Sequence, residues 1–160
     1  MTRLFPEDGR AVSSTVEDFA DVTENLRDLQ LLESALRYLP HSSRWNHRLA
    51  MTLKGSEFTG DDKNALARNT LFECFVAAGF SRCGARVIPE EPDIIGRWKG
   101  WRFSVACKRI KSQKKVVDRL SEGYAQLAAC RTPGFVAIDD TMLDEDVFAG
   151  PRAHEVVVER

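Results

Sequence analysis

The sequence has few cysteines, and none of them are closely spaced. Four occur in 160 residues with no Cys-x-x-Cys pair among them: Cys74, Cys83, Cys107 and Cys130. This spacing argues against a structural zinc site and gives no disulfide framework of the kind that holds small secreted domains together. We therefore expect a reduced, cytoplasmic setting.

Long apolar runs are also missing. No stretch approaches the ~20 apolar residues that a membrane-spanning helix needs, so no membrane association is expected. The first ten residues include acidic side chains and precede no apolar run, which is unlike a signal peptide. There is no internal repeat or low-complexity tract, and the length and 43% hydrophobic content predict a single domain over residues 1–160.

The chain has no net positive charge, but its basic residues are concentrated in one segment. The formal net charge is −1 at pH 7, whereas nucleic-acid-binding domains are often basic throughout. Between Arg97 and Arg119, however, nine basic residues stand against a single acid, Asp118. The rest of the chain is clearly acidic, so this segment is where contact with a polyanion is expected.

The apolar pattern predicts an α/β fold. Spacings of three and four residues predict helices over three segments: 14–40, about 60–78, and about 113–131. Short β-prone runs bounded by proline and glycine predict four strands: 85–88, 93–95, 101–110 and 135–138. The order is helix, three strands, helix, strand, with an additional N-terminal helix over 14–40 in front of a core at about 60–140, which indicates a mixed sheet flanked by helices. The segment 40–60 has no clear pattern and is compatible with a short helix or a short strand.

Two features define the expected geometry of the second and third strands. The glycines of Gly96–Gly100 predict a five-residue hairpin loop, which makes these strands antiparallel neighbours. In the third strand, the odd positions from Trp101 to Cys107 are apolar and predict the core face. Ala106 and Lys108 therefore share the opposite face.

Acidic and basic residues at strand ends suggest phosphodiester chemistry. Asp93 opens the second strand within Glu-Pro-Asp, and Lys108 ends the run Val-Ala-Cys-Lys on the third. Hydrolysis of a phosphodiester needs a hard cation held by oxygen ligands and benefits from a lysine that stabilises developing charge. Glu73, on the preceding helix, adds a second carboxylate.

These motifs resemble the PD-(D/E)xK, or restriction-endonuclease-like, nuclease superfamily over roughly residues 64–138. The resemblance implies a Mg²⁺- or Mn²⁺-dependent DNA endonuclease. By the same resemblance, Asp93 would be the principal metal ligand and Glu73 a helix-borne ligand or base. Lys108 would stabilise charge or position water, and the backbone carbonyl of Cys107 would be a further ligand.

The sequence departs from that family at one position, because the motif acid is replaced by Ala106. A methyl group cannot ligate a cation, so metal binding and turnover are expected to be severely impaired. Three explanations remain open: a natural pseudo-nuclease that binds DNA without cutting it, a migrated acid such as Glu90 or Glu91, or an engineered substitution. Retention of the other motif residues favours the last.

The basic segment supplies the expected nucleic-acid contacts. They lie between the motif lysine and the next helix, with one polar residue on that helix: Arg109, Lys111, Ser112, Lys114, Lys115 and Gln126. The alternative is a solvated loop kept soluble by charge. A non-catalytic DNA-binding or assembly module is the second functional hypothesis, and a domain that binds an acidic protein is the third. A homodimer or larger complex is compatible with either nuclease-like reading.

Overall fold

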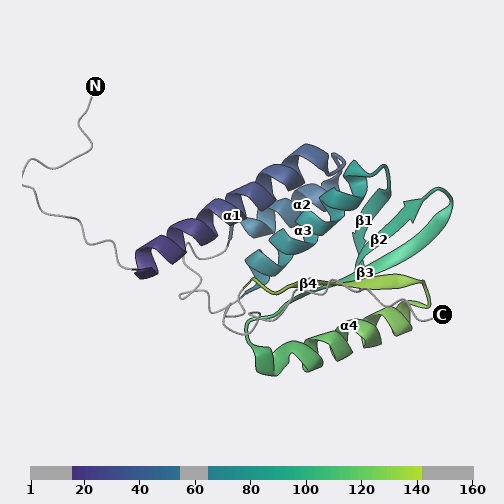
Figure 1. The fold of residues 1–160 in the computed structure, drawn as a ribbon. Coiled ribbons are helices and arrows are strands. Elements are labelled where there is room, and N and C mark those ends of the chain that lie inside the picture. Colours follow the sequence, from purple (N-terminus) through teal and green to yellow (C-terminus); the bar gives the residue numbers. More distant parts are fainter. Residues whose placement is uncertain (1–15, 55–64, 142–160) are drawn as a thin grey trace, which may run out of the picture.

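A computed structural model describes residues 16–54 and 65–141, with side chains described from residue 22 onward (Figure 1). These residues form four helices: α1 (Val16–Tyr38), α2 (Ser43–Thr52), α3 (Leu66–Arg82) and α4 (Val116–Cys130), the last preceded by the 3₁₀ turn η2 (Gln113–Lys115). Four strands complete the described fold: β1 (Arg86–Glu90), β2 (Asp93–Trp98), β3 (Trp101–Arg109) and β4 (Gly134–Asp139). None of these helices is long and apolar enough to cross a membrane.

The strands form one mixed sheet in the order β1-β2-β3-β4. The pairs β1–β2 and β2–β3 are antiparallel, and β4 pairs with β3 in parallel. The predicted α/β class, mixed sheet and N-terminal helix are therefore confirmed. The order α3, three strands, α4, β4 is also the predicted one.

The hairpin between β2 and β3 is tighter than predicted. Trp98 pairs with Trp101, so only Lys99 and Gly100 remain in the loop, where a five-residue loop was expected. Both have positive φ, 48° and 88°. Two left-handed residues in succession give a turn whose twist matches that of the flanking strands, and this lets the ladder continue to the tip.

Helices cover both faces of the sheet (Figure 1). On one face, the Phe80 ring of α3 lies 4.9 Å from that of Phe103 in β3 and 6.2 Å from that of Phe135 in β4, measured between centroids. On the other, α4 approaches β4 so closely that a Cβ on Gly123 would lie 2.9 Å from the side chain of Val136.

Burial along β3 follows these two layers rather than a simple alternation. Ser104, Val105 and Ala106 are all fully buried, because α3 covers the odd face and α4 the even face. Trp101 was expected on the core face, but its side chain is 76% exposed at the hairpin end of the sheet. The alternating sequence pattern therefore predicts which face of the sheet each β3 residue occupies. The helices that cover each face determine how exposed the residue is.

The N-terminal helix α1 packs against α3 with only part of its apolar face. Ala35 and Leu39 belong to the core, in one cluster with Ala77 and Ala78 of α3. Four residues of the apolar stripe predicted for this helix are more than half exposed: Val22, Leu26, Leu29 and Leu36. The packing of this helix is therefore concentrated at Ala35 and, just beyond its end, Leu39, whereas these four apolar side chains are largely exposed.

The segment that the sequence left unassigned forms α2, which lies against β1. Trp45 is 1% exposed, and its indole Nε1 donates a hydrogen bond to the Val87 carbonyl of β1 at 3.1 Å. The hydroxyl of Ser42 caps the helix by accepting from the Trp45 amide at 3.3 Å. The buried tryptophan thus ties α2 to the sheet edge, while Arg48 of α2 binds Glu73 of α3.

Candidate functional site

Asp93 sits where β2 and β3 separate. The last paired residues of the β2–β3 ladder are Ile94 and Val105. Just beyond this pair, the Asp93 side chain replaces the backbone as the hydrogen-bond acceptor for β3. Its Oδ2 accepts a hydrogen bond from the Cys107 amide at 2.7 Å. The side chain therefore closes the end of the ladder with a backbone N–H of β3, and one of its oxygens is already occupied.

Glu73 reaches the same region from α3. Its Oε2 accepts from Nη1 of Arg48, on α2, at 2.9 Å, and only 12% of the Glu73 side chain is exposed. Burial raises the pKa of Glu73 from 4.5 to about 7, and the negative charge of Asp93 adds to the increase. Arg48 and Lys108 act in the opposite direction but do not cancel it.

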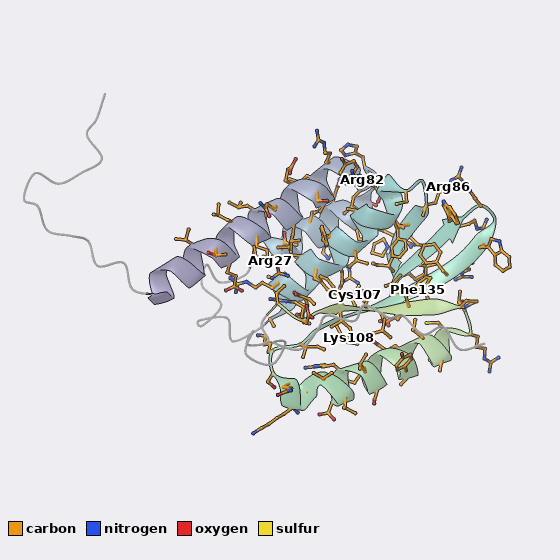
Figure 2. All side chains as sticks on the ribbon, viewed as in Figure 1. Arg27, Arg82, Arg86, Cys107, Lys108 and Phe135 are labelled. Carbon is orange, nitrogen blue, oxygen red and sulfur yellow. The ribbon has the colours of Figure 1, made fainter. Side chains whose placement is uncertain are left out.

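The pKa of Asp93 is raised as well. Burial is the main cause, opposed by the Cys107 hydrogen bond and by the charge of Lys108. The structure therefore brings Glu73, Asp93 and Lys108 from α3, β2 and β3 within electrostatic range of one another. Figure 2 shows Cys107 and Lys108 on opposite sides of the sheet, as successive residues of a strand must be.

Ala106 occupies the position of the motif acid and is 0% exposed. It pairs with Val136 of β4, whose side chain faces Gly123 of α4. Neighbouring partners in a ladder point to the same face, so Ala106 lies under α4. The Ala106 side chain is therefore tightly packed and supplies no oxygen ligand.

Neither acid suggested as a replacement completes a cation site. Glu90 is half exposed and pairs with Arg44 at 3.6 Å. Glu91 acts on Glu73 and Asp93 through its charge, raising the pKa of both. Within residues 16–54 and 65–141, no three histidine, cysteine, aspartate or glutamate side chains are grouped so that they could hold a metal ion.

The described residues therefore offer few oxygen ligands to a divalent cation. Hard cations need several oxygen ligands in open positions. Here Asp93 is bound to an amide and Glu73 to a guanidinium. The ligand expected from Cys107 is its backbone carbonyl, which stays a prediction. Its thiol offers no alternative, because burial, followed by the charges of Asp93 and Glu73, raises its pKa far above the usual range and keeps it protonated.

The predicted nucleic-acid contacts divide into two groups. Four are exposed around η2, where phosphate can reach them: Lys111, Ser112, Lys114 and Lys115. Gln126 on α4 is half buried, and its Oε1 atom is buried without a hydrogen-bond partner. It is therefore less accessible than the lysines.

Arg109 was predicted to contact nucleic acid, and its position contradicts this. Its side chain is 3% exposed, and Nε lies 2.8 Å from Oδ2 of Asp139 on β4. Arg27 of α1 binds the other oxygen of the same carboxylate at 2.8 Å. A phosphate on the surface cannot reach a guanidinium that is committed to this buried ion pair.

Sequence reasoning missed Arg48 and the pocket beside it. An open surface pocket of about 430 Å³ is lined by Ser43, Arg44, His47 and Arg48 of α2 and by Pro89 of β1. The signal that could have revealed it is the i, i+4 spacing of Arg44 and Arg48, which places both on one face of a helix. That signal was not usable while the segment had no assigned structure.

Comparison with protein-family models, curated proteins and solved structures gave no match to this chain. Function is therefore inferred from its own residues.

The ionisation of Glu73 should appear in the pH dependence of stability. A carboxyl whose pKa is higher in the folded than in the unfolded state binds more protons when folded, so stability falls as pH rises. Between pH 4.5 and about 7, we expect Glu73 to lower the free energy of unfolding by up to about 3 kcal/mol. Glu73→Gln should remove this component, as measured by urea denaturation across that range.

The matched control is Glu122→Gln, which changes an exposed glutamate paired with Arg119. Its pH profile should parallel that of the original protein. Equal slopes for the original protein and Glu73→Gln would show that Glu73 titrates normally.

Proposed function

We propose that this chain is a nucleic-acid-binding domain with the core layout of the PD-(D/E)xK nucleases but without a competent metal site. The observation that supports this most is the state of the two carboxylates. Glu73 is bound to Arg48 and Asp93 to the Cys107 amide, while a buried alanine stands at the third position. Binding without hydrolysis is the function that such an arrangement favours.

The basic residues that follow Lys108 support binding to a phosphate backbone. Lys111, Lys114 and Lys115 are exposed, and the only ion pair recorded for them within the described residues joins Lys115 to Asp118 at 3.4 Å. An exposed pair of this kind is worth little and is easily exchanged for a phosphate. Binding through such lysines depends strongly on salt and weakly on base sequence.

A second candidate is a Mg²⁺-dependent deoxyribonuclease in which position 106 carries an acid. It is favoured by one observation, the convergence of Glu73, Asp93 and Lys108 from three elements. An acid at position 106 would lie two residues before Lys108 on the same face of β3. The two candidates differ in their prediction for a carboxylate added at position 106: it would produce DNA cleavage in a nuclease and none in a binding domain.

Cleavage assays on variants of position 106 separate the candidates. We expect the original protein and Ala106→Glu to bind DNA in a salt-sensitive way and to leave a supercoiled plasmid intact in Mg²⁺ or Mn²⁺. Ala106→Gln has the size of the glutamate variant without its charge and serves as the control. Ala106→Asp is the smaller alternative, and thermal melts show which variants fold in this packed position.

Strong cleavage by Ala106→Glu or Ala106→Asp, absent from Ala106→Gln, would establish the nuclease and refute a purely binding role. Absence of any nucleic-acid binding at low salt would refute both candidates. It would direct attention to an acidic protein as the partner of the basic segment.

A further inference from the structure

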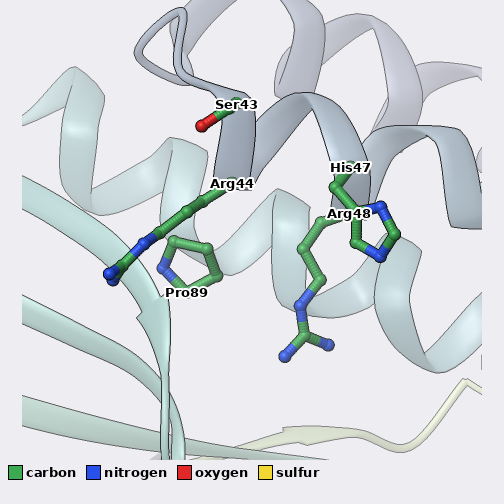
Figure 3. Close-up of a pocket in the computed structure, with 5 residues that line it drawn as sticks. All are labelled: Ser43, Arg44, His47, Arg48 and Pro89. Atoms are coloured by element: carbon green, nitrogen blue, oxygen red, sulfur yellow. The ribbon is translucent and has the colours of Figure 1, made fainter.

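The pocket between α2 and β1 concentrates hydrogen-bond donors on one side of the candidate site. Ser43, Arg44, His47 and Arg48 occupy about one and a half turns of α2 and line an open surface pocket of about 430 Å³, bordered on the sheet side by Pro89 (Figure 3). Pro89 carries no backbone N–H and no side-chain acceptor. The polar side chains that line the pocket therefore all belong to α2.

The two arginines of this pocket have different partners. Arg44 is 63% exposed and faces Glu90 at 3.6 Å across a half-exposed pair, which costs little to break. Arg48 is 30% exposed and is held by Glu73 at 2.9 Å. Figure 3 shows both guanidinium groups extending from α2 toward the sheet, with Pro89 between them in this view.

The pocket lies on the face of α2 opposite its buried anchor. Trp45 lies between Arg44 and Arg48 in the sequence but points the other way, into the core, where it binds the Val87 carbonyl. Because α2 is fixed by this anchor, its opposite face is presented at a constant place beside β1. A preformed set of donors loses little conformational freedom when a ligand binds.

We propose that this pocket binds a phosphate group of the nucleic-acid strand, next to the Glu73, Asp93 and Lys108 cluster. Guanidinium groups match phosphate oxygens in geometry and charge, and the hydroxyl and imidazole add further donors. Arg48 joins the two places, because it lines the pocket and also binds Glu73. The identity of the polymer rests on the proposed function, whereas phosphate recognition rests on the pocket alone.

The test compares Arg44→Ala/His47→Ala with the original protein in fluorescence anisotropy on one single-stranded DNA oligonucleotide. Both side chains are exposed, so the double variant should fold normally. We expect about tenfold weaker binding at pH 8 and a salt slope lower by about one, as for the loss of one phosphate contact. The control is Arg86→Ala, which removes one exposed arginine of β1 outside the basic segment and should leave binding unchanged.

Two forms of the oligonucleotide, with a 5′-phosphate or a 5′-hydroxyl, show whether the pocket binds a terminal or an internal phosphate. If the pocket takes a strand end, a 5′-phosphorylated oligonucleotide should bind the original protein more tightly than its 5′-hydroxyl form, and the double variant should lose this preference. If it takes an internal phosphate, the double variant should weaken both forms equally. Either result supports the pocket, and unchanged binding of both forms by the double variant overturns it.

Inorganic phosphate separates failure of the pocket from failure of the proposed function. In the original protein it should shift the ring resonances of His47 in a saturable way, and Arg44→Ala should abolish the shift. A saturable shift in a protein that binds no oligonucleotide would keep the phosphate pocket and refute nucleic acid as the partner. Absence of a shift, with oligonucleotide binding that the double variant leaves unchanged, would refute the pocket alone.

Discussion

Asp139→Ala is expected to lower the free energy of unfolding by about 3–5 kcal/mol, because it leaves buried guanidinium charge without a partner. The Asp139 side chain is 2% exposed and binds Arg109 of β3 and Arg27 of α1, each at 2.8 Å. Burial raises the pKa of this carboxyl, but hydrogen bonds from Thr141 and Arg27 and the charges of both arginines outweigh it and hold the pKa below its usual value. The carboxylate is thus ionised at neutral pH.

The matched control for this prediction is Asp118→Ala. Asp118 also forms an ion pair, with Lys115 at 3.4 Å, but both side chains are more than 60% exposed. Its removal should change stability by less than about 1 kcal/mol. Guanidinium chloride denaturation of both variants makes the comparison, and equal effects would mean that the Asp139 pairs contribute no more than a surface pair.

Trp45→Ala is expected to destabilise the protein by about 3–5 kcal/mol and to release α2 from the sheet. Trp45 is among the largest fully buried side chains and belongs to the same cluster as Val87 and Ile94. Its loss leaves a cavity and an unpaired carbonyl at Val87. Circular dichroism during urea denaturation measures the change in stability.

Two further variants separate packing from hydrogen bonding at this position. Trp45→Phe keeps most of the volume and loses the indole N–H, so it should cost about 1–2 kcal/mol. Trp101→Ala removes a tryptophan that is 76% exposed and should cost less than about 1 kcal/mol. If Trp45→Ala were as mild as Trp101→Ala, α2 would not be held by this anchor, and the preformed phosphate pocket would lose its physical basis.

The roles of the arginines were the least accessible to sequence reasoning. Arg109 lies in a basic run and was grouped with its neighbours, yet it is buried in an ion pair with Asp139 of β4, a carboxylate that Arg27 of α1 also binds. Arg48 lies in a segment without a clear pattern, and its partner Glu73 is 25 residues away. Both arginines are placed by carboxylates from other elements, and nothing in their immediate sequence specifies those partners.

The sequence by itself determined the order of elements, the antiparallel pairing of β2 with β3, and the common face of Ala106 and Lys108. These features depend on the spacing of apolar residues and on the residues that favour turns, both of which are set by a few neighbouring positions in the chain. Only the tertiary structure decided the place of α2, the burial of Arg109 and the pairing of Glu73 with Arg48. Those features arise from contacts between elements far apart in the chain, where burial and charge depend on what packs against each residue.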